Sequence, residues 1–141
     1  MEPVARPDYE ALLRFRTALR RFHSWSEQQA KVVGLTHAQH QLLLAVKGHP
    51  GPDAPTIGDV AAYLLLRHHS AVELVNRVQA AGLLNRDRDG ADARVVRLRL
   101  TQKGESCLEQ LTDLHLSELR QLAPLLAHVV DGSELQHGPL G

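Results

Sequence analysis

The spacing of apolar residues between positions 56 and 81 predicts two consecutive amphipathic helices. Thr56 is placed to cap the first helix, and Asp59 three positions later nearly completes a capping box, in place of the usual Glu or Gln. Its expected buried stripe follows the i, i+3, i+4, i+7, i+8 spacing and consists of Ile57, Val60, Ala61, Leu64 and Leu65. The second helix, from about Arg67 to Ala81, repeats this spacing with Ala71, Leu74, Val75 and Val78.

The second helix has a mainly polar outward face. It carries His69, Glu73, Asn76, Arg77 and Ala80, with His68 and Ser70 near the helix start. Hydrogen-bonding groups near the first turn of an exposed helix can enter a DNA major groove and meet base edges. The same residues also fit an ordinary solvated face, so this helix alone does not decide between the two interpretations.

A β-hairpin is predicted directly after these helices. Gly82 suits the C-terminal stop of the second helix. Two strands, 83–88 and 94–100, then flank a turn at 89–93, and in the second strand Val96, Leu98 and Leu100 alternate with arginines. Helix, helix and hairpin in this order form a helix-turn-helix with a wing, which is a DNA-reading device.

The wing carries several arginines. Asp92 stands two residues before Arg94, where its carboxylate can orient the guanidinium through a charge-assisted pair. An arginine at a hairpin tip suits a minor groove, whose negative potential attracts it. Phosphate contacts are expected from backbone amides and from Arg86, Arg88, Arg97 and Arg99. Base contacts are expected from His69, Ser70, Glu73 and Asn76. Thr56 and Arg67, near the starts of the two helices, are also expected to belong to the DNA-binding site.

Long helices are predicted on both sides of this region. A first helix runs from Tyr9 to a break at Gly34, and a capping box at 36–39 starts a helix to about Lys47, followed by a loop at 48–55 that holds three prolines. Thr101 can cap a last helix, which Pro124 should kink or interrupt. We expect a flexible arm at 1–8, one domain at 9–130 and a flexible tail at 131–141. Within the domain, 36–103 is the DNA-binding lobe, and 9–33 and 104–130 are dimerisation helices.

Composition limits the class of protein. The 141 residues suffice for one sizeable core, and no apolar run approaches a membrane span. The start lacks an apolar signal core and Cys107 is the single cysteine, so a reducing cytoplasm is expected. Net charge is zero, but residues 67–103 carry eight basic and four acidic side chains, whereas 104–141 carry one basic and six acidic ones. The basic middle favours contact with phosphates.

The leucine and aromatic residues of the first and last helices present more apolar surface than one small winged domain can cover. Exposed apolar surface of that size usually marks an interface. We therefore expect a homodimer joined through the two chain ends. A two-fold dimer would present two recognition helices about one DNA turn apart and select near-palindromic sites.

The chain resembles the multiple-antibiotic-resistance regulator (MarR) family of winged helix-turn-helix repressors over roughly residues 9–130. Five segments at family-like spacings carry the resemblance: Gly34-Leu35-Thr36, Ile57 to Ala61, Val72 to Leu83, Asp89 to Arg94, and Leu100 to Gly104. The resemblance implies a mainly helical dimer with a small wing, and a recognition helix carrying His68, His69, Ser70, Glu73, Asn76 and Arg77. It also implies Arg94, supported by Asp92, as the wing-tip arginine, and release of DNA by a small aromatic or phenolic effector.

Other functions have less support in the sequence. His37 and His40 lie three apart on one helical face, and His23 and His115 can approach them, but no Cys or carboxylate stands beside them at ligand spacing, so no metal or other cofactor is expected. Cys107 lies among leucines, where a thiol tends to be inert. No nucleophile signature or glycine-rich phosphate loop favours an enzyme. Metal- or redox-sensing variants of the regulator remain the minor alternatives.

The main alternative is a winged helix that binds protein instead of DNA. Glu73 places a negative charge on the outward face, and the helix starts at Arg67-His68-His69 without a clear N-cap. A glutamate can accept from the amino group of cytosine, and Arg77 can neutralise it as an i,i+4 pair, so Glu73 does not forbid DNA binding.

Overall fold

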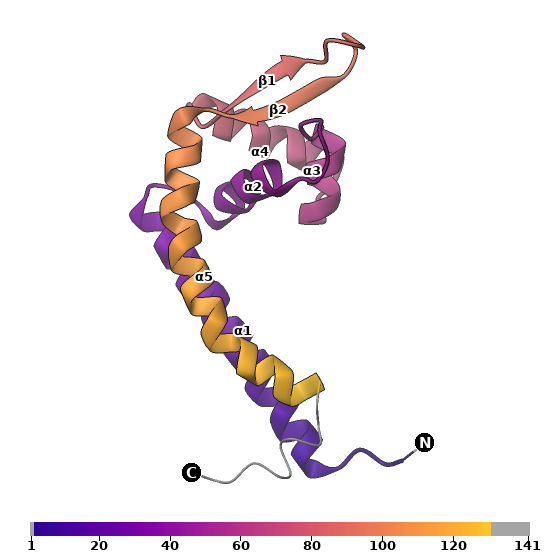
Figure 1. Cartoon of the computed structure of the whole chain (residues 1–141), viewed down its shortest axis with the longest axis vertical. Helices are drawn as coiled ribbons and strands as arrows, with labels where there is room; N and C mark the ends of the chain where they lie inside the picture. The colour runs from indigo at the N-terminus through magenta and orange to yellow at the C-terminus, as the bar shows by residue number, and fades with distance from the viewer. Residues whose placement is uncertain (1, 131–141) are drawn as a thin grey trace. The chain divides into compact units, whose positions relative to one another are not determined.

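The computed structural model describes residues 2–130 (Figure 1). Within them lie five helices and two strands: α1 (Arg6–Val32), α2 (His37–Gly48), α3 (Ile57–Leu64), α4 (His68–Ala80), β1 (Leu84–Arg88), β2 (Val96–Leu100) and α5 (Gln102–Val130). The order matches the predicted helix-turn-helix with a wing. The predicted tail at 131–141 lies outside the described residues. The chain divides into two compact units, one made of the two ends up to Gln28 and from Thr112, the other of Gln29–Leu111.

Helix α1 begins earlier than expected, at Arg6 rather than Tyr9. The backbone N–H of Ala5 donates to the carboxylate of Asp8 at 3.1 Å, and the N–H of Asp8 donates to the carbonyl of Ala5 at 3.0 Å. Pro7 fits this position because the first helical turn has no hydrogen bond for its missing N–H to lose. Part of the segment predicted as a loose arm is therefore helical.

Capping boxes start α2 and α3. At α2, the Thr36 hydroxyl accepts from the Gln39 N–H and the Gln39 side chain accepts from the Thr36 N–H, both at 3.1 Å. At α3, Thr56 and Asp59 form the same reciprocal pair at 3.2 and 2.9 Å. Asp59 thus closes the box that the sequence only approximated, and two orphan N–H groups of α3 are satisfied.

The end of α3 differs from the prediction. The helix stops at Leu64, and Leu65 adopts a left-handed conformation with φ of 55° and is 92% exposed. Leu65 is therefore not part of the buried stripe. Its neighbour Leu66 packs against the core instead. The reversal of backbone curvature at Leu65 sends Leu66 inward, and α4 begins two residues later.

The core of the 29–111 unit is formed by all of its elements. Its buried members are Ala30, Leu35, Leu42, Leu43, Val46, Val60, Leu74, Val75, Val78, Leu83, Leu84, Leu98, Leu108 and Leu111. The strands pair antiparallel with Leu84 opposite Leu100 and Arg86 opposite Leu98. Directly opposed residues share a face of the hairpin. Arg86 therefore lies on the same face as the buried Leu84 and Leu98.

Helix α5 starts at the end of the hairpin. The Thr101 hydroxyl accepts from the Gly104 N–H at 3.1 Å and donates to the carbonyl of Gly82 at 2.6 Å. A Cβ on Gly104 would lie 2.0 Å from the carbonyl oxygen of Leu83, so only glycine fits there. The helix continues through Pro124 to Val130, so the expected interruption is absent from the helix as described.

In the unit formed by the chain ends, α1 and α5 run side by side (Figure 1). The Ser26 hydroxyl lies 2.6 Å from Nε2 of His115, whose ring packs against Phe22 and Trp25. Many apolar side chains of this unit remain exposed: Tyr9, Leu12, Leu13, Leu114, Leu116, Leu119 and Leu126. A groove of about 850 Å³ lies between the two helices and is lined partly by Leu13, Trp25 and Leu122.

Candidate nucleic-acid interface

Helix α4 presents one buried and one exposed side. Ala71, Leu74, Val75 and Val78 are buried, as the spacing predicted. His68, His69, Glu73, Asn76 and Arg77 are exposed, and Ser70 is half-buried. Arg67 is the N-cap and makes no side-chain cap hydrogen bond. The N–H groups of the first turn are therefore not satisfied by that side chain.

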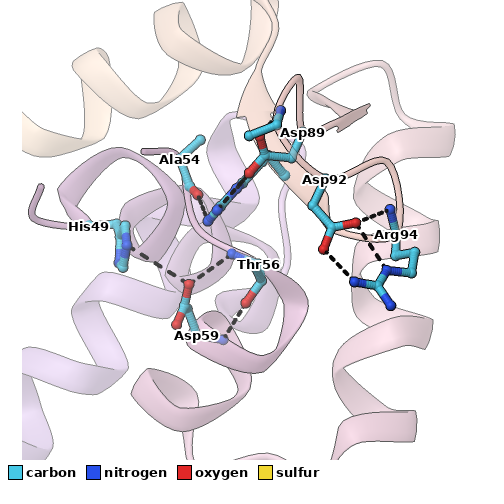
Figure 2. A network of polar contacts seen from close by, with 9 residues as sticks. His49, Ala54, Thr56, Asp59, Asp89, Asp92 and Arg94 are labelled. Atoms are coloured by element: carbon cyan, nitrogen blue, oxygen red, sulfur yellow. Dashed lines mark hydrogen bonds and ion pairs between the residues drawn. The ribbon is translucent and has the colours of Figure 1, made fainter. Parts of the chain in front are cut away.

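The wing-tip pair is formed as predicted. The Asp92 carboxylate accepts from Nε and Nη2 of Arg94, both at 3.1 Å, and from the Arg94 backbone N–H at 3.0 Å (Figure 2). The hydrogen bonds from the Arg94 side chain and backbone lower the pKa of Asp92, so its carboxylate stays charged. The Arg94 side chain is 91% exposed. The tip therefore presents an oriented guanidinium to solvent.

Arg97 has a different position from the one expected of a phosphate contact. Its guanidinium donates to Asp89 at 2.9 and 3.2 Å and to the carbonyl of Ala54 at 3.0 Å, and only 20% of its side chain is exposed. The N–H of Leu98 donates to the carbonyl of Pro55 at 2.8 Å. Arg97 thus joins the turn end of the hairpin, where Asp89 lies, to the loop before α3. Hydrogen bonds from the Ala91 N–H and from Arg97 lower the pKa of Asp89, and Asp89 raises that of Arg97.

A second polar network, formed by His49, Asp59 and Tyr63, was not predicted from the sequence. Nδ1 of His49 lies 2.7 Å from the Tyr63 hydroxyl. Nε2 of the same ring lies 3.8 Å from the Asp59 carboxylate (Figure 2). The pKa of Asp59 is lowered, chiefly because its carboxylate accepts from the Thr56 backbone N–H. His49 follows α2, whereas Asp59 and Tyr63 belong to α3. Only folding of the proline-rich loop between them brings these groups together.

The remaining wing arginines also have partners within the wing or on α4. Arg86 donates to the side-chain oxygens of Gln79 and Asn76 on α4, the latter at 2.6 Å. Arg88 donates to the Ala93 carbonyl at 2.9 Å, and Arg99 lies 3.4 Å from Asp87. The structure thus brings the predicted base-reading residue Asn76 and the predicted phosphate contact Arg86 into direct contact.

The structure also bears on four other subjects of the sequence analysis: the Glu73–Arg77 pair, a metal site, Cys107 and a membrane span. No ion pair within 4.0 Å joins Glu73 to Arg77 in the described part of the chain, so the i,i+4 pair is not formed there. Residues 2–130 hold no group of three or more His, Cys, Asp or Glu side chains placed to bind a metal ion. Cys107 is partly buried against the core of the 29–111 unit. No helix within the described range is both long and apolar enough to cross a membrane.

Comparison with known proteins supports the architecture. A sequence model of the MarR family matches residues 33–95. The uncharacterised helix-turn-helix regulator YsmB of Bacillus subtilis is 31% identical over 67 residues, a match that spans 48% of this chain and 46% of YsmB. The crystal structure of a MarR family transcription regulator is 25% identical, with a TM-score of 0.68 over 91% of this chain and 80% of its own. Over residues 33–95 the chain is therefore similar to the MarR family. Members of this family are DNA-binding transcriptional regulators and not enzymes.

Two further solved structures with this fold concern DNA binding or its regulation by a small molecule. A DNA complex of MepR from Staphylococcus aureus has a TM-score of 0.67 at 21% identity and covers 79% of this chain and 81% of MepR. BpsR of Bordetella bronchiseptica, whose DNA binding is regulated by 6-hydroxynicotinic acid, has a TM-score of 0.60 at 24% identity and covers 76% of this chain and 79% of BpsR. At these identities the likeness establishes the shared fold.

Proposed function

We propose that this chain is a MarR-family, sequence-specific, double-stranded DNA-binding transcriptional regulator that acts as a homodimeric repressor in the cytoplasm. The observation that carries the proposal is the wing tip, where Asp92 holds a 91% exposed Arg94 at the end of a hairpin. A guanidinium oriented in this way suits the narrow, negative minor groove. The exposed polar face of α4 belongs to the same unit.

In this proposal, base recognition and phosphate contact are assigned to different groups of residues. The exposed side chains His69, Glu73 and Asn76 of α4, with the half-buried Ser70, meet base edges in the major groove. The N–H groups of the first turn of α4, together with the exposed Arg67, His68, Arg77 and Arg88, meet phosphates. Thr56 and Arg97 are half-buried; Thr56 caps the start of α3, and Arg97 joins the turn end of the wing to the loop before α3. Sequence choice then rests on α4, and affinity rests mainly on the charged groups.

Dimerisation through the chain ends is supported by their surface. The groove of about 850 Å³ and the exposed leucines of α1 and α5 form an apolar face with no covering segment among residues 2–130. A two-fold dimer buries such a face against its own copy. It would also place two α4 helices about 34 Å apart, which selects a near-palindromic operator.

Regulation by a small molecule is supported by one relative. BpsR responds to 6-hydroxynicotinic acid, a small hydroxylated aromatic compound. By analogy, an aromatic or phenolic effector would release DNA from the present chain by binding one arrangement of the dimer more tightly than the other.

Binding to duplex DNA at increasing salt tests the proposal. A DNA reader loses affinity with a log–log slope of about −0.9 per phosphate contacted. Arg94→Ala should weaken binding at all sites by about 1–3 kcal/mol through loss of the groove contact. Arg6→Ala is the matched control, because Arg6 is an exposed, ion-paired arginine on α1. If the wild-type chain binds no duplex DNA, the exposed Glu73 favours a protein-binding winged helix instead.

A further inference from the structure

We infer that Arg86, a wing-strand residue, determines which base α4 reads, because it fixes the side-chain amide of Asn76. The inference rests on the proposed DNA-binding function and adds a specificity-determining residue to it. Arg86 lies on the hairpin face that carries the buried Leu84 and Leu98. From there its guanidinium reaches two α4 amides, with Nη1 toward Gln79 and Nη2 2.6 Å from Oδ1 of Asn76.

The chemistry of the pair fixes the orientation of the amide. A guanidinium has five N–H donors and no acceptor, so only the oxygen of the Asn76 amide can face it. The two N–H donors of Asn76 then point away from Arg86. Asn76 is exposed and lies three residues after the exposed Glu73 on the outward face of α4. The amide therefore offers its donors to whatever approaches that face.

This orientation favours one kind of base edge. A free asparagine pairs with adenine by accepting from N6 and donating to N7. Here the oxygen already accepts a charge-assisted bond, and the adjacent cation repels the N6 amino group of adenine. Guanine presents only acceptors, N7 and O6, to the major groove. Asn76 held by Arg86 should therefore prefer guanine to adenine.

Glu73 complements this preference. Its carboxylate offers only acceptors, and the major-groove donor of a G·C pair is the cytosine amino group. The outward face of α4 thus presents an acceptor at Glu73 and, one turn later, donors at Asn76. This order matches an operator half-site rich in G·C pairs where the middle of α4 lies.

Selection of bound sites from random duplexes tests the inference. Asn76→Ala first identifies the base position that Asn76 reads. Arg86→Met keeps an unbranched stem but removes the guanidinium, and it should lower the preference for guanine over adenine at that position by at least about fivefold, the equivalent of one hydrogen-bonded base contact. Arg88→Met is the matched control, because Arg88 is on the same strand and, among residues 2–130, donates only to the Ala93 carbonyl. The control should lose affinity without changing the preference.

Asn76→Asp separates base reading from structural support. The aspartate keeps a partner for Arg86, so its thermal stability should equal or exceed that of the wild type, yet it has no N–H to donate and should lose the guanine preference. This variant also serves if Arg86→Met does not fold. An adenine preference in the wild type, or an unchanged guanine preference in Arg86→Met or Asn76→Asp, would overturn the inference and leave DNA binding intact. Absence of any selected site would overturn the proposed function as well.

Discussion

Apolar side chains are buried in one of the two units of this chain and largely exposed in the other. In the 29–111 unit, Leu84 and Leu98 are 0% exposed, and helices and hairpin cover them from several sides. In the unit of the chain ends, Leu13 is 65% exposed and Tyr9 63%, although both lie on a long regular helix. Two helices packed side by side cover only one side of each other. The winged lobe therefore completes its own core, whereas the terminal helices need a further surface to complete theirs.

The largest expected effect comes from truncating a leucine in each unit. Leu98→Ala should lower the free energy of unfolding by about 2–5 kcal/mol, since it removes a buried side chain and leaves a cavity. Leu13→Ala should change it by no more than about 0.5 kcal/mol at high dilution, as expected for a surface position. Urea denaturation at low and high protein concentration measures both. If the terminal helices dimerise, the loss of stability in Leu13→Ala should grow with protein concentration. Equal losses of unfolding free energy in the two variants at high dilution would contradict the difference between the units.

The second prediction concerns the close approach of α5 to the hairpin. Gly104→Ala should destabilise the chain by about 1–3 kcal/mol, because the new Cβ would press on the Leu83 carbonyl and force the backbone to shift. Gly48→Ala is the control, since a Cβ there meets nothing within 4 Å. Thermal unfolding compares the two variants. Equal stability would mean that α5 approaches the hairpin less closely than described.

The third prediction compares helix starts in the two units. Thr56→Ala removes the acceptor of the α3 capping box and should lower stability by about 1 kcal/mol. Asp8→Ala removes the carboxylate that accepts from Ala5 at the exposed start of α1, and it should cost less than about 0.5 kcal/mol. Chemical denaturation gives both values. A larger loss for Asp8→Ala would show that α1 is ordered more firmly at its start than its exposure indicates.

The smallest effect is the pH dependence of the winged lobe. The pKa values of Asp59, Asp89 and Asp92 lie below the ordinary value of 3.8. A carboxyl group with a lowered folded pKa stabilises the fold above its unfolded pKa, and this contribution is lost as the pH falls through the folded value. Stability should therefore decline with acidification below about pH 4. Asp89→Asn should flatten the decline, and an unchanged slope would show that the Asp89 carboxyl does not contribute.

Some features were readable from local sequence alone. The capping residues Thr36 and Thr56 and the buried stripe of α4 depend on neighbours within four residues along the chain. Asp92 and Arg94 are two residues apart, so their pairing was also predictable. The wrong details arose where competing local rules applied. At Leu65 the apolar spacing continued past the point where the backbone turned left-handed. Pro124 lies inside the continuous α5, so the expected interruption is wrong, whereas the expected kink stays a prediction.

The sequence by itself determined the helices, the hairpin and the oriented wing-tip arginine, because periodicity, caps and short turns act between near neighbours. Only the tertiary structure decided what the other arginines do. Arg97 reaches a carbonyl 43 residues away, and Arg86 reaches an amide 10 residues away on another element. No pattern along the chain reveals such partners. The hydrogen-bond partner of a long charged side chain depends on which acceptors lie near it after the chain has folded.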